Sequence, residues 1–192
     1  HPEEEPVIAE EDVLAFLKKR RRVLDGVCIT GGEPTLAPEL PSLIRSIKEL
    51  GYLVKLDTNG THPAVVRRLT EEKLIDYVAM DIKSSREHYD RLAGSSSEKL
   101  LSAVEETAAF LMNGSLDYEF RTTVVRELHE EDDFEKIRDW LAGCKRYYLQ
   151  AYKDSEHILK PDSYSSYSRE ELEHFAGILR KKIPLVEIRG ID

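Results

Sequence analysis

The stretch Gly26-Val27-Cys28-Ile29-Thr30-Gly31-Gly32-Glu33-Pro34-Thr35 changes within a few residues from an apolar run to a pair of glycines. The apolar run 26–30 predicts a buried strand. Two successive glycines let a ligand approach the bare backbone, and Pro34 directs the chain out of the turn. The carboxylate of Glu33 stands where it can meet an ammonium group. The motif predicts a ligand loop at a strand end, although a simple tight turn explains it equally well.

The composition is that of a globular chain with one domain, residues 1–192. The net charge of −9 argues against an extended surface for nucleic acid or an anionic membrane. No apolar run is long enough to span a bilayer, and the acidic start at residues 1–6 is unlike a signal peptide. The two cysteines, Cys28 and Cys144, form no disulfide framework, so we expect a cytoplasmic protein. Cys28, in mid-strand, is expected to be an inert buried thiol.

Strand-like and helical segments alternate along the chain. The predicted strands cover residues 26–30, 52–56, 75–82, 118–125, 147–151 and 184–188. The predicted helices cover residues 8–22, 38–50, 62–69, 86–92, 97–113, 130–141 and 168–182. Such alternation predicts parallel strands joined by crossover helices. An incomplete TIM-type barrel and an open doubly wound sheet both fit this pattern.

Three predicted strands end in polar or glycine-rich motifs, and this recurrence is the main functional signal of the sequence. The motifs are Gly31-Gly32-Glu33, Asp57-Thr58-Asn59-Gly60 and Asp81-Ile82-Lys83. In both candidate folds ligands bind at the carboxyl ends of the strands, so we expect the motifs to meet there. Simpler explanations exist, because Asn59-Gly60 is typical of an Asx turn, and Asp81 with Lys83 can form a surface ion pair.

Other polar and aromatic residues carry weaker signals. Arg121 lies in an alternating strand and points either out to solvent or inward to a carboxylate. The six histidines lack the spacing of a metal site, and His88 is expected on a helix surface. Five tyrosines suit either a polar groove rim or the core. They are Tyr147, Tyr148, Tyr152, Tyr164 and Tyr167.

Together, the strand-end motifs resemble those of the glycyl-radical-enzyme activases of the radical S-adenosylmethionine (SAM) superfamily. The likeness is first to activating proteins of anaerobic ribonucleoside-triphosphate reductase, and next to pyruvate formate-lyase activase. It runs from about residue 10 to the end and rests on residues 29–35, 56–60 and 80–83 and their order. The first motif is common among radical SAM enzymes, whereas the other two together narrow the match to activases.

The resemblance implies a SAM site at the strand ends. Its residues would be Gly31, Gly32, Glu33, Asp81, Ile82, Lys83, Arg121 and Lys153. The first three would hold the methionyl amino group mainly through backbone groups, and Lys83 would favour the carboxylate. Lys153 departs from pyruvate formate-lyase activase, which has a SAM-contacting His at that place. A monovalent cation would lie beside SAM, held by Asp57, Thr58, the carbonyl of Ala79 and Asp81.

The implied reaction is reductive cleavage of SAM at a [4Fe–4S] cluster, which yields methionine and a 5′-deoxyadenosyl radical. The radical would take a hydrogen atom from a backbone glycine of the partner, expected to be anaerobic ribonucleoside-triphosphate reductase. Flavodoxin or ferredoxin would supply the electron. In such enzymes the cofactor performs the difficult step, while the protein positions and shields it.

The chain departs from the family at the cluster. Family members bind it with three cysteines in a Cys-x3-Cys-x2-Cys loop after the first strand, and this chain has only Cys28 and Cys144. No strand is predicted before the helix over 8–22. We therefore expect a partial TIM-type barrel without its first strand, truncated just after the cysteine loop. As it stands, the chain is expected to bind no cluster and to be inactive.

Two alternatives stay open. A small radical SAM enzyme of the carboxy-deazaguanine synthase type would also carry the Gly-Gly-Glu-Pro motif. A cluster-free module that binds SAM or a protein would explain the missing cysteines. A Cys-x3-Cys-x2-Cys segment encoded just upstream of His1 would favour the enzyme, whereas a start codon at that point would favour the module.

Overall fold

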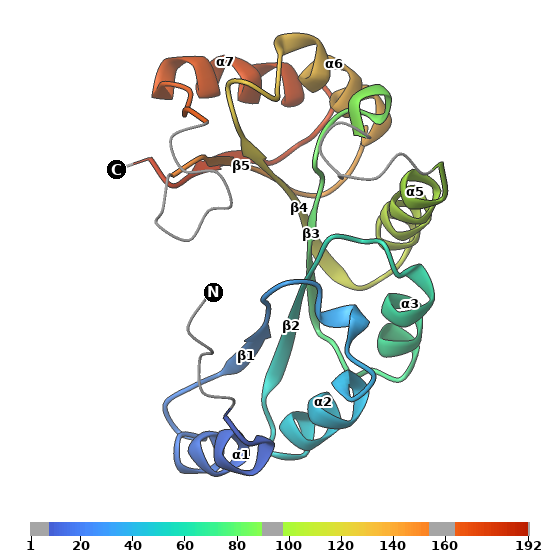
Figure 1. The fold of residues 1–192 in the computed structure, drawn as a ribbon, viewed down its shortest axis with the longest axis vertical. Coiled ribbons are helices and arrows are strands. Elements are labelled where there is room, and N and C mark those ends of the chain that lie inside the picture. Colours follow the sequence, from blue (N-terminus) through green and yellow to red (C-terminus); the bar gives the residue numbers. More distant parts are fainter. Residues whose placement is uncertain (1–7, 90–97, 154–163, 192) are drawn as a thin grey trace, which may run out of the picture.

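A computed structural model describes residues 8–89, 98–153 and 164–191, which build an α/β fold around one curved parallel sheet (Figure 1). The strands are β1 Gly26–Ile29, β2 Leu53–Thr58, β3 Tyr77–Asp81, β4 Asp117–Val124, β5 Tyr147–Ala151 and β6 Val186–Arg189. Their order across the sheet is their order in the sequence. A doubly wound sheet reverses its strand order at a switch point, whereas a barrel does not. The sheet is therefore an open, partial TIM-type barrel.

One helix precedes β1 and the others connect successive strands, and all lie along the convex side of the sheet (Figure 1). They are α1 Glu10–Lys19, α2 Leu40–Glu49, α3 Pro63–Glu71, α5 Glu98–Asn113, α6 Glu131–Trp140 and α7 Arg169–Leu179. The predicted alternation is confirmed, with element ends shifted by a few residues. Short 3-10 turns follow β1 at Pro34–Leu36 and β3 at Arg86–His88. The helix predicted over 86–92 thus starts as a 3-10 turn, and residues 90–92 lie outside the described part.

The core fills the space between the sheet and the helices. Side chains alternate along a strand, so every second sheet residue points at the helices. Among these are Leu56 on β2, Met80 on β3 and Phe120 on β4, all fully buried. From the other side, α2 contributes Ile44 and Ile47, three residues apart on one helix face. None of the helices within the described residues is long and apolar enough to cross a membrane.

The concave face of the sheet carries charged side chains. Asp57 follows Leu56, and Asp81 follows Met80, so both carboxylates lie on the face opposite to the core. Arg121 on β4 stands beside Asp81 in the strand register. One face of the sheet therefore builds the fold, and the other presents charges at the edge where the strands end.

The sequence predictions for the side chains of Cys28 and His88 are wrong. Cys28 is exposed instead of buried, because its side chain lies on the concave face of an edge strand, 3.5 Å from an Asp57 oxygen. His88 is partly buried instead of lying on a helix surface, and its Nδ1 is 2.8 Å from an oxygen of Asp133. For the tyrosines, the core alternative holds at Tyr147, which is fully buried.

Candidate functional site

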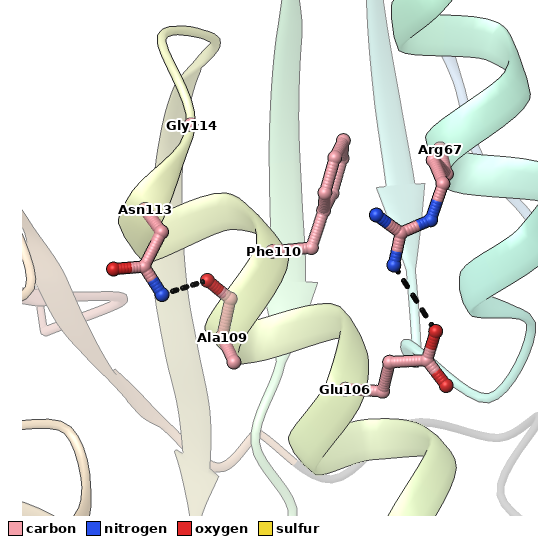
Figure 2. A pocket seen from close by; sticks show the side chains of 6 residues that line it. All are labelled: Arg67, Glu106, Ala109, Phe110, Asn113 and Gly114. Carbon is pink, nitrogen blue, oxygen red and sulfur yellow. Dashed lines mark hydrogen bonds and ion pairs between the residues drawn. The ribbon is translucent and has the colours of Figure 1, made fainter.

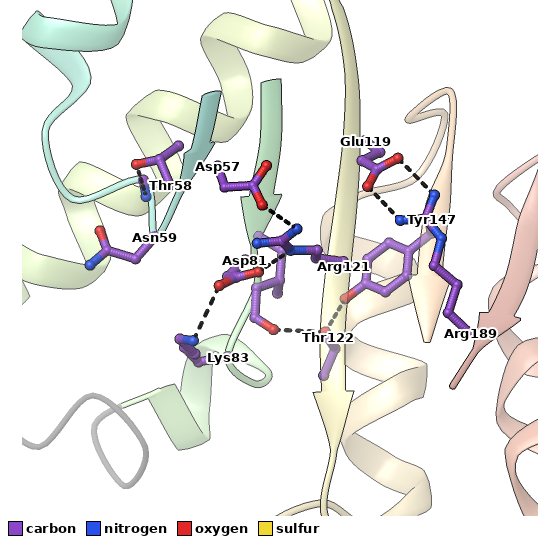
Figure 3. Close-up of polar contacts among 12 residues, drawn as sticks. Asp57, Thr58, Asn59, Asp81, Lys83, Glu119, Arg121, Thr122, Tyr147 and Arg189 are labelled. Carbon is purple, nitrogen blue, oxygen red and sulfur yellow. Dashed lines mark hydrogen bonds and ion pairs between the residues drawn. The ribbon is translucent and has the colours of Figure 1, made fainter. Parts of the chain in front are cut away.

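A cavity of about 250 Å³ opens where the first strands end, on the concave side of the sheet. Its lining residues are Thr30, Gly31, Gly32, Asp57, Thr58, Asn59, Asp81, Lys83 and Arg121. The three motifs expected at this edge all contribute to it. Figure 3 shows Asp57, Asp81 and Arg121 pointing toward one another, with Lys83 beside Asp81. In barrels of parallel strands this is the edge that carries the active site.

A larger cavity of about 380 Å³ lies between α3 and α5 on the convex side (Figure 2). Among the described residues that line it, the one cationic side chain is Arg67, which contacts Glu106 at 3.1 Å and lies over the Phe110 ring. The strand-end cavity is smaller, but charged groups from three different strands converge on it. The convergence of a few polar groups in a concave pocket is a mark of a binding site.

Gly31 and Gly32 form the part of the cavity wall next to β1. Their φ angles are +96° and +52°, a backbone conformation that residues with a Cβ rarely adopt. A Cβ added to either glycine would meet no atom within 4 Å, so the space in front of them is open. The pair therefore presents bare backbone to the cavity.

The carboxylate of Glu33 is bound by the protein itself. Its Oε1 accepts hydrogen bonds from the Thr35 amide at 3.1 Å and the Thr58 hydroxyl at 2.8 Å, and the Thr35 hydroxyl also donates to it. Its Oε2 accepts from the Asn59 amide at 2.6 Å. The side chain thus ties the turn after β1 to the turn after β2. It does not stand ready for a ligand ammonium, contrary to the sequence prediction, whereas binding through the Glu33 backbone stays a prediction.

Three cations and two carboxylates meet at the strand ends. Arg121 lies between the carboxylates, donating from Nη1 to Asp57 at 2.9 Å and from Nε to Asp81. Lys55 pairs with the other oxygen of Asp57, and Lys83 Nζ lies 3.4 Å from Asp81. A group of this kind can bind a ligand that carries both an ammonium and a carboxylate.

The pKa shifts agree with ionised groups at this place. Burial by itself raises the pKa of Asp57, but hydrogen bonds from Lys55 and Arg121 outweigh it and hold that pKa below its usual value. Burial would lower the pKa of Arg121, and pairing with Asp81 and Asp57 raises it instead. Partial desolvation of the Cys28 thiol, whose residue is exposed, and the nearby Asp57 carboxylate both raise its pKa. Cys28 is therefore poorly suited to act as a thiolate nucleophile.

Not every predicted site residue reaches the cavity. Arg121 adopts the inward one of its two predicted orientations. The side chain of Ile82 is fully buried in the core, and Ala79 is fully buried opposite Asp57 in the strand register. Lys153 is exposed, and it is not among the described residues that line the cavity. Roles of Ile82, Ala79 and Lys153 in binding stay predictions.

Sequence reasoning did not select Thr30, and it placed Asn59 in a motif at this edge but explained it as part of a turn. Thr30 directly follows β1, so its position was a usable signal. The Asx turn predicted at Asn59-Gly60 is confirmed, because Asn59 Oδ1 accepts from the Thr61 amide at 2.9 Å. Asn59 lines the cavity as well, so the turn and the site coincide.

A second polar network on the concave face was also missed. Glu119 on β4 is nearly fully buried and binds both terminal nitrogens of Arg189 on β6, at 2.7 and 3.0 Å. Tyr77 on β3 donates to the same carboxylate at 2.9 Å. The sequence signal for this network was the spacing of Glu119 and Arg121, which are two residues apart and therefore lie on the same face of the sheet. The network joins three strands of the open sheet, as Figure 3 shows in part.

Comparison with known proteins agrees with this geometry. The family described as the radical SAM superfamily matches residues 2–141. The chain belongs to the radical SAM superfamily. It is 33% identical over 172 residues to a Methanocaldococcus jannaschii protein named "Putative glycyl-radical enzyme activating enzyme MJ1227". The alignment covers 88% of this chain and 72% of the Methanocaldococcus jannaschii protein. The resemblance to activases that the sequence predicts is thus confirmed.

Two further similarities bear on this radical SAM chain. Over 73 residues it is 43% identical to 7-carboxy-7-deazaguanine synthase of Neisseria meningitidis. These residues make up 38% of this chain and 30% of the synthase. The solved structure of a domain of pyruvate-formate lyase-activating enzyme from Bacteroides vulgatus matches with a TM-score of 0.67. That match covers 86% of this chain and 99% of the domain at 20% identity, so it shows the fold alone.

The cavity fits the methionyl part of SAM, the ligand that the radical SAM family implies. The bare backbone at Gly31 and Gly32 leaves room for close approach. The cations Lys83 and Arg121 and the carboxylate Asp81 offer partners for a ligand with one carboxylate and one ammonium. This fit rests on the charges and the open space.

A [4Fe–4S] cluster does not fit the residues of this chain. The family uses three thiolates at one place, whereas the chain has two cysteines, Cys28 exposed on β1 and Cys144 buried. Within the described ranges, no three or more His, Cys, Asp and Glu side chains are grouped so that they could hold a metal ion. Binding of a monovalent cation stays a prediction. Arg121 lies between Asp57 and Asp81, the two carboxylates expected to bind that cation.

We predict that Glu33→Ala destabilises the protein. Four hydroxyl and amide donors at Thr35, Thr58 and Asn59 lose their acceptor, which should lower the free energy of unfolding by about 2–3 kcal/mol. Urea unfolding followed by circular dichroism measures this. Glu39→Ala, at an exposed glutamate before α2, is the control and should change stability by less than about 0.5 kcal/mol. Equal losses in the two variants would contradict the proposed tie between the turns.

A second prediction concerns pH. Because the folded pKa of Asp57 lies below the unfolded value of about 3.9, its pairing stabilises the fold above that pH. The contribution is lost as pH falls through the folded pKa. Asp57→Asn should therefore lower stability at neutral pH and flatten the decline of stability in acid, measured by urea unfolding across the pH range. With the exposed Asp12→Asn as control, an unchanged acid decline in both variants rejects the prediction.

Proposed function

We propose that this chain is the SAM-binding part of an activating enzyme for a glycyl radical enzyme, and thus part of an oxidoreductase. The observation that carries the proposal is the strand-end cavity, in which the three motifs that suggested an activase come together. The identity to the Methanocaldococcus jannaschii protein supports it, because that alignment covers most of both chains. The pair of motifs at 57–60 and 81–83 favours an activase over other radical SAM enzymes.

The residues have separate roles in this proposal. Backbone groups at Gly31 and Gly32 would accept the methionyl ammonium, and the Lys83 ammonium would pair with the carboxylate. Asp81 would add a second acceptor for the ammonium. Arg121 would hold Asp57 and Asp81 at their present separation while it also faces the ligand. Bound SAM would supply the 5′-deoxyadenosyl radical on one-electron reduction.

We further propose that these 192 residues by themselves bind SAM without cleaving it. Reductive cleavage in this family needs three cluster thiolates, which would have to come from outside the present residues. Flavodoxin or ferredoxin would be the electron donor, and anaerobic ribonucleoside-triphosphate reductase the partner, in the cytoplasm. A glycine on that partner would be the site of hydrogen abstraction.

A second candidate is a radical SAM enzyme of the carboxy-deazaguanine synthase type. The 43% identity to the Neisseria meningitidis enzyme favours it locally. That match covers well under half of either chain, whereas the activase match covers most of both. We therefore rank it second.

Calorimetric titration of the purified chain with SAM tests the binding site. Lys83→Ala should weaken SAM binding roughly 10- to 100-fold, because a charge-assisted hydrogen bond is lost, and should leave the binding of decarboxylated SAM unchanged. Lys145→Ala is a matched control, since Lys145 has the same 47% side-chain exposure as Lys83 and also faces an aspartate. Equal affinity of wild type and Lys83→Ala for SAM would place the site elsewhere.

The activase assignment has its own test. The gene product that contains this chain, reconstituted with iron and sulfide without oxygen and then reduced, should produce a glycyl radical on anaerobic ribonucleoside-triphosphate reductase. Electron paramagnetic resonance detects the radical, and 5′-deoxyadenosine is measured in parallel. The 192-residue chain alone is the control and should form no 5′-deoxyadenosine. SAM cleavage by the gene product without a radical on that partner, but with conversion of a deazaguanine precursor, would support the second candidate.

A further inference from the structure

The segment after β3 brings Lys83 to the cavity, and the backbone of this residue is held on both sides. The Lys83 carbonyl accepts a hydrogen bond from His129 Nε2 at 2.8 Å. The Lys83 amide donates to the Tyr89 hydroxyl at 3.4 Å. His129 and Tyr89 are 2% and 1% exposed, and neither is among the described residues that line the cavity. Both therefore contact Lys83 from the protein interior.

The partners of His129 define how its ring is held. A carbonyl oxygen only accepts, so Nε2 carries the proton that it shares with Lys83. Nδ1 lies 3.1 Å from the Val125 amide and 3.2 Å from the Val125 carbonyl oxygen. With the proton on Nε2, Nδ1 of the neutral ring accepts from the amide. Turning the ring would break both bonds inside the protein. His129 is thus a fixed connection between the end of β4 and Lys83.

A buried carboxylate holds the residues that follow Lys83. Asp133, 1% exposed, accepts through Oδ1 from the Ser84 and Ser85 hydroxyls and from His88 Nδ1, the last at 2.8 Å. Its Oδ2 accepts from the Glu130 amide at 3.0 Å as part of the capping box of α6. One side chain therefore holds the residues that follow Lys83 against the first turn of α6.

We infer that His129 and Tyr89 are positioning residues for Lys83, fixing the backbone point from which its ammonium reaches a carboxylate in the cavity. A lysine side chain is long and flexible, so its pairing with a ligand depends strongly on where its backbone is held. Lys83 is also 47% exposed and contacts Asp81 at 3.4 Å, so few side-chain contacts fix it. The identity of the carboxylate ligand, SAM, rests on the proposed function.

Calorimetry on the purified chain, with SAM and decarboxylated SAM as ligands, tests the inference. His129→Leu should weaken SAM binding about tenfold and leave decarboxylated SAM unaffected, because only the carboxylate meets Lys83. His129→Gln offers an amide donor and an oxygen acceptor and should restore most of the affinity. In a Lys83→Ala background, His129→Leu should add no further loss, since the two residues act through one contact.

A matched pair of tyrosine variants keeps the test decisive if His129→Leu does not fold. Tyr89→Phe removes the hydroxyl that accepts from the Lys83 amide. Tyr118→Phe is the match, because the Tyr118 residue is as buried as Tyr89 and its hydroxyl accepts from the Lys145 amide at 3.2 Å, away from the cavity. Tyr89→Phe should lower the preference for SAM over decarboxylated SAM, and Tyr118→Phe should not. If Tyr89→Phe and Tyr118→Phe show the same preference for SAM over decarboxylated SAM, the inference is overturned.

A measurement without ligand separates this inference from the proposed function. The rates at which Lys83 and Lys145 react with an acylating reagent are compared by mass spectrometry in the same sample. Loss of either contact to the Lys83 backbone should loosen Lys83 from Asp81, so the Lys83 to Lys145 ratio should rise several-fold in His129→Leu and Tyr89→Phe. An unchanged ratio contradicts positioning by His129 and Tyr89. If the wild-type chain fails to bind SAM, the proposed function falls, and this ratio alone decides the inference.

Discussion

The guanidinium of Arg121 between the carboxylates of Asp57 and Asp81 is the interaction on which the candidate site depends. Two carboxylates on adjacent strands repel each other unless a cation lies between them. Arg121 supplies that cation from a third strand and is itself only 15% exposed. The contact therefore links β2, β3 and β4 on their charged face, and it determines which charges the cavity presents to a ligand.

The charged face is supported by polar contacts that lie outside the cavity. Glu33 binds the turns after β1 and β2 together. His129 and Asp133 hold the segment after β3 against the start of α6. A buried hydrogen-bonded group is costly to displace, so such contacts keep the strand ends in fixed relative positions. Exposed, flexible cations such as Lys83 are therefore attached to a backbone whose position is fixed.

Local patterns in the sequence predicted the strands, the crossover helices and the Asx turn at Asn59, because each depends on neighbouring residues. They also predicted that the motifs after β1, β2 and β3 meet, because parallel strands present their carboxyl ends at one edge. The partners of individual side chains could not be predicted in this way. Glu33 binds groups 25 and 26 residues away, and Arg121 binds Asp57 at a separation of 64 residues.

By itself, the sequence determined the parallel α/β class, the strand-end location of the site and the likeness to radical SAM activases. Periodicity and short motifs are local, so a single sequence displays them. Only the tertiary structure decided that Arg121 points inward, that the Glu33 carboxylate joins two turns, and that Cys28 is exposed. These outcomes depend on which distant groups lie within hydrogen-bonding distance and on which face of the curved sheet each side chain emerges.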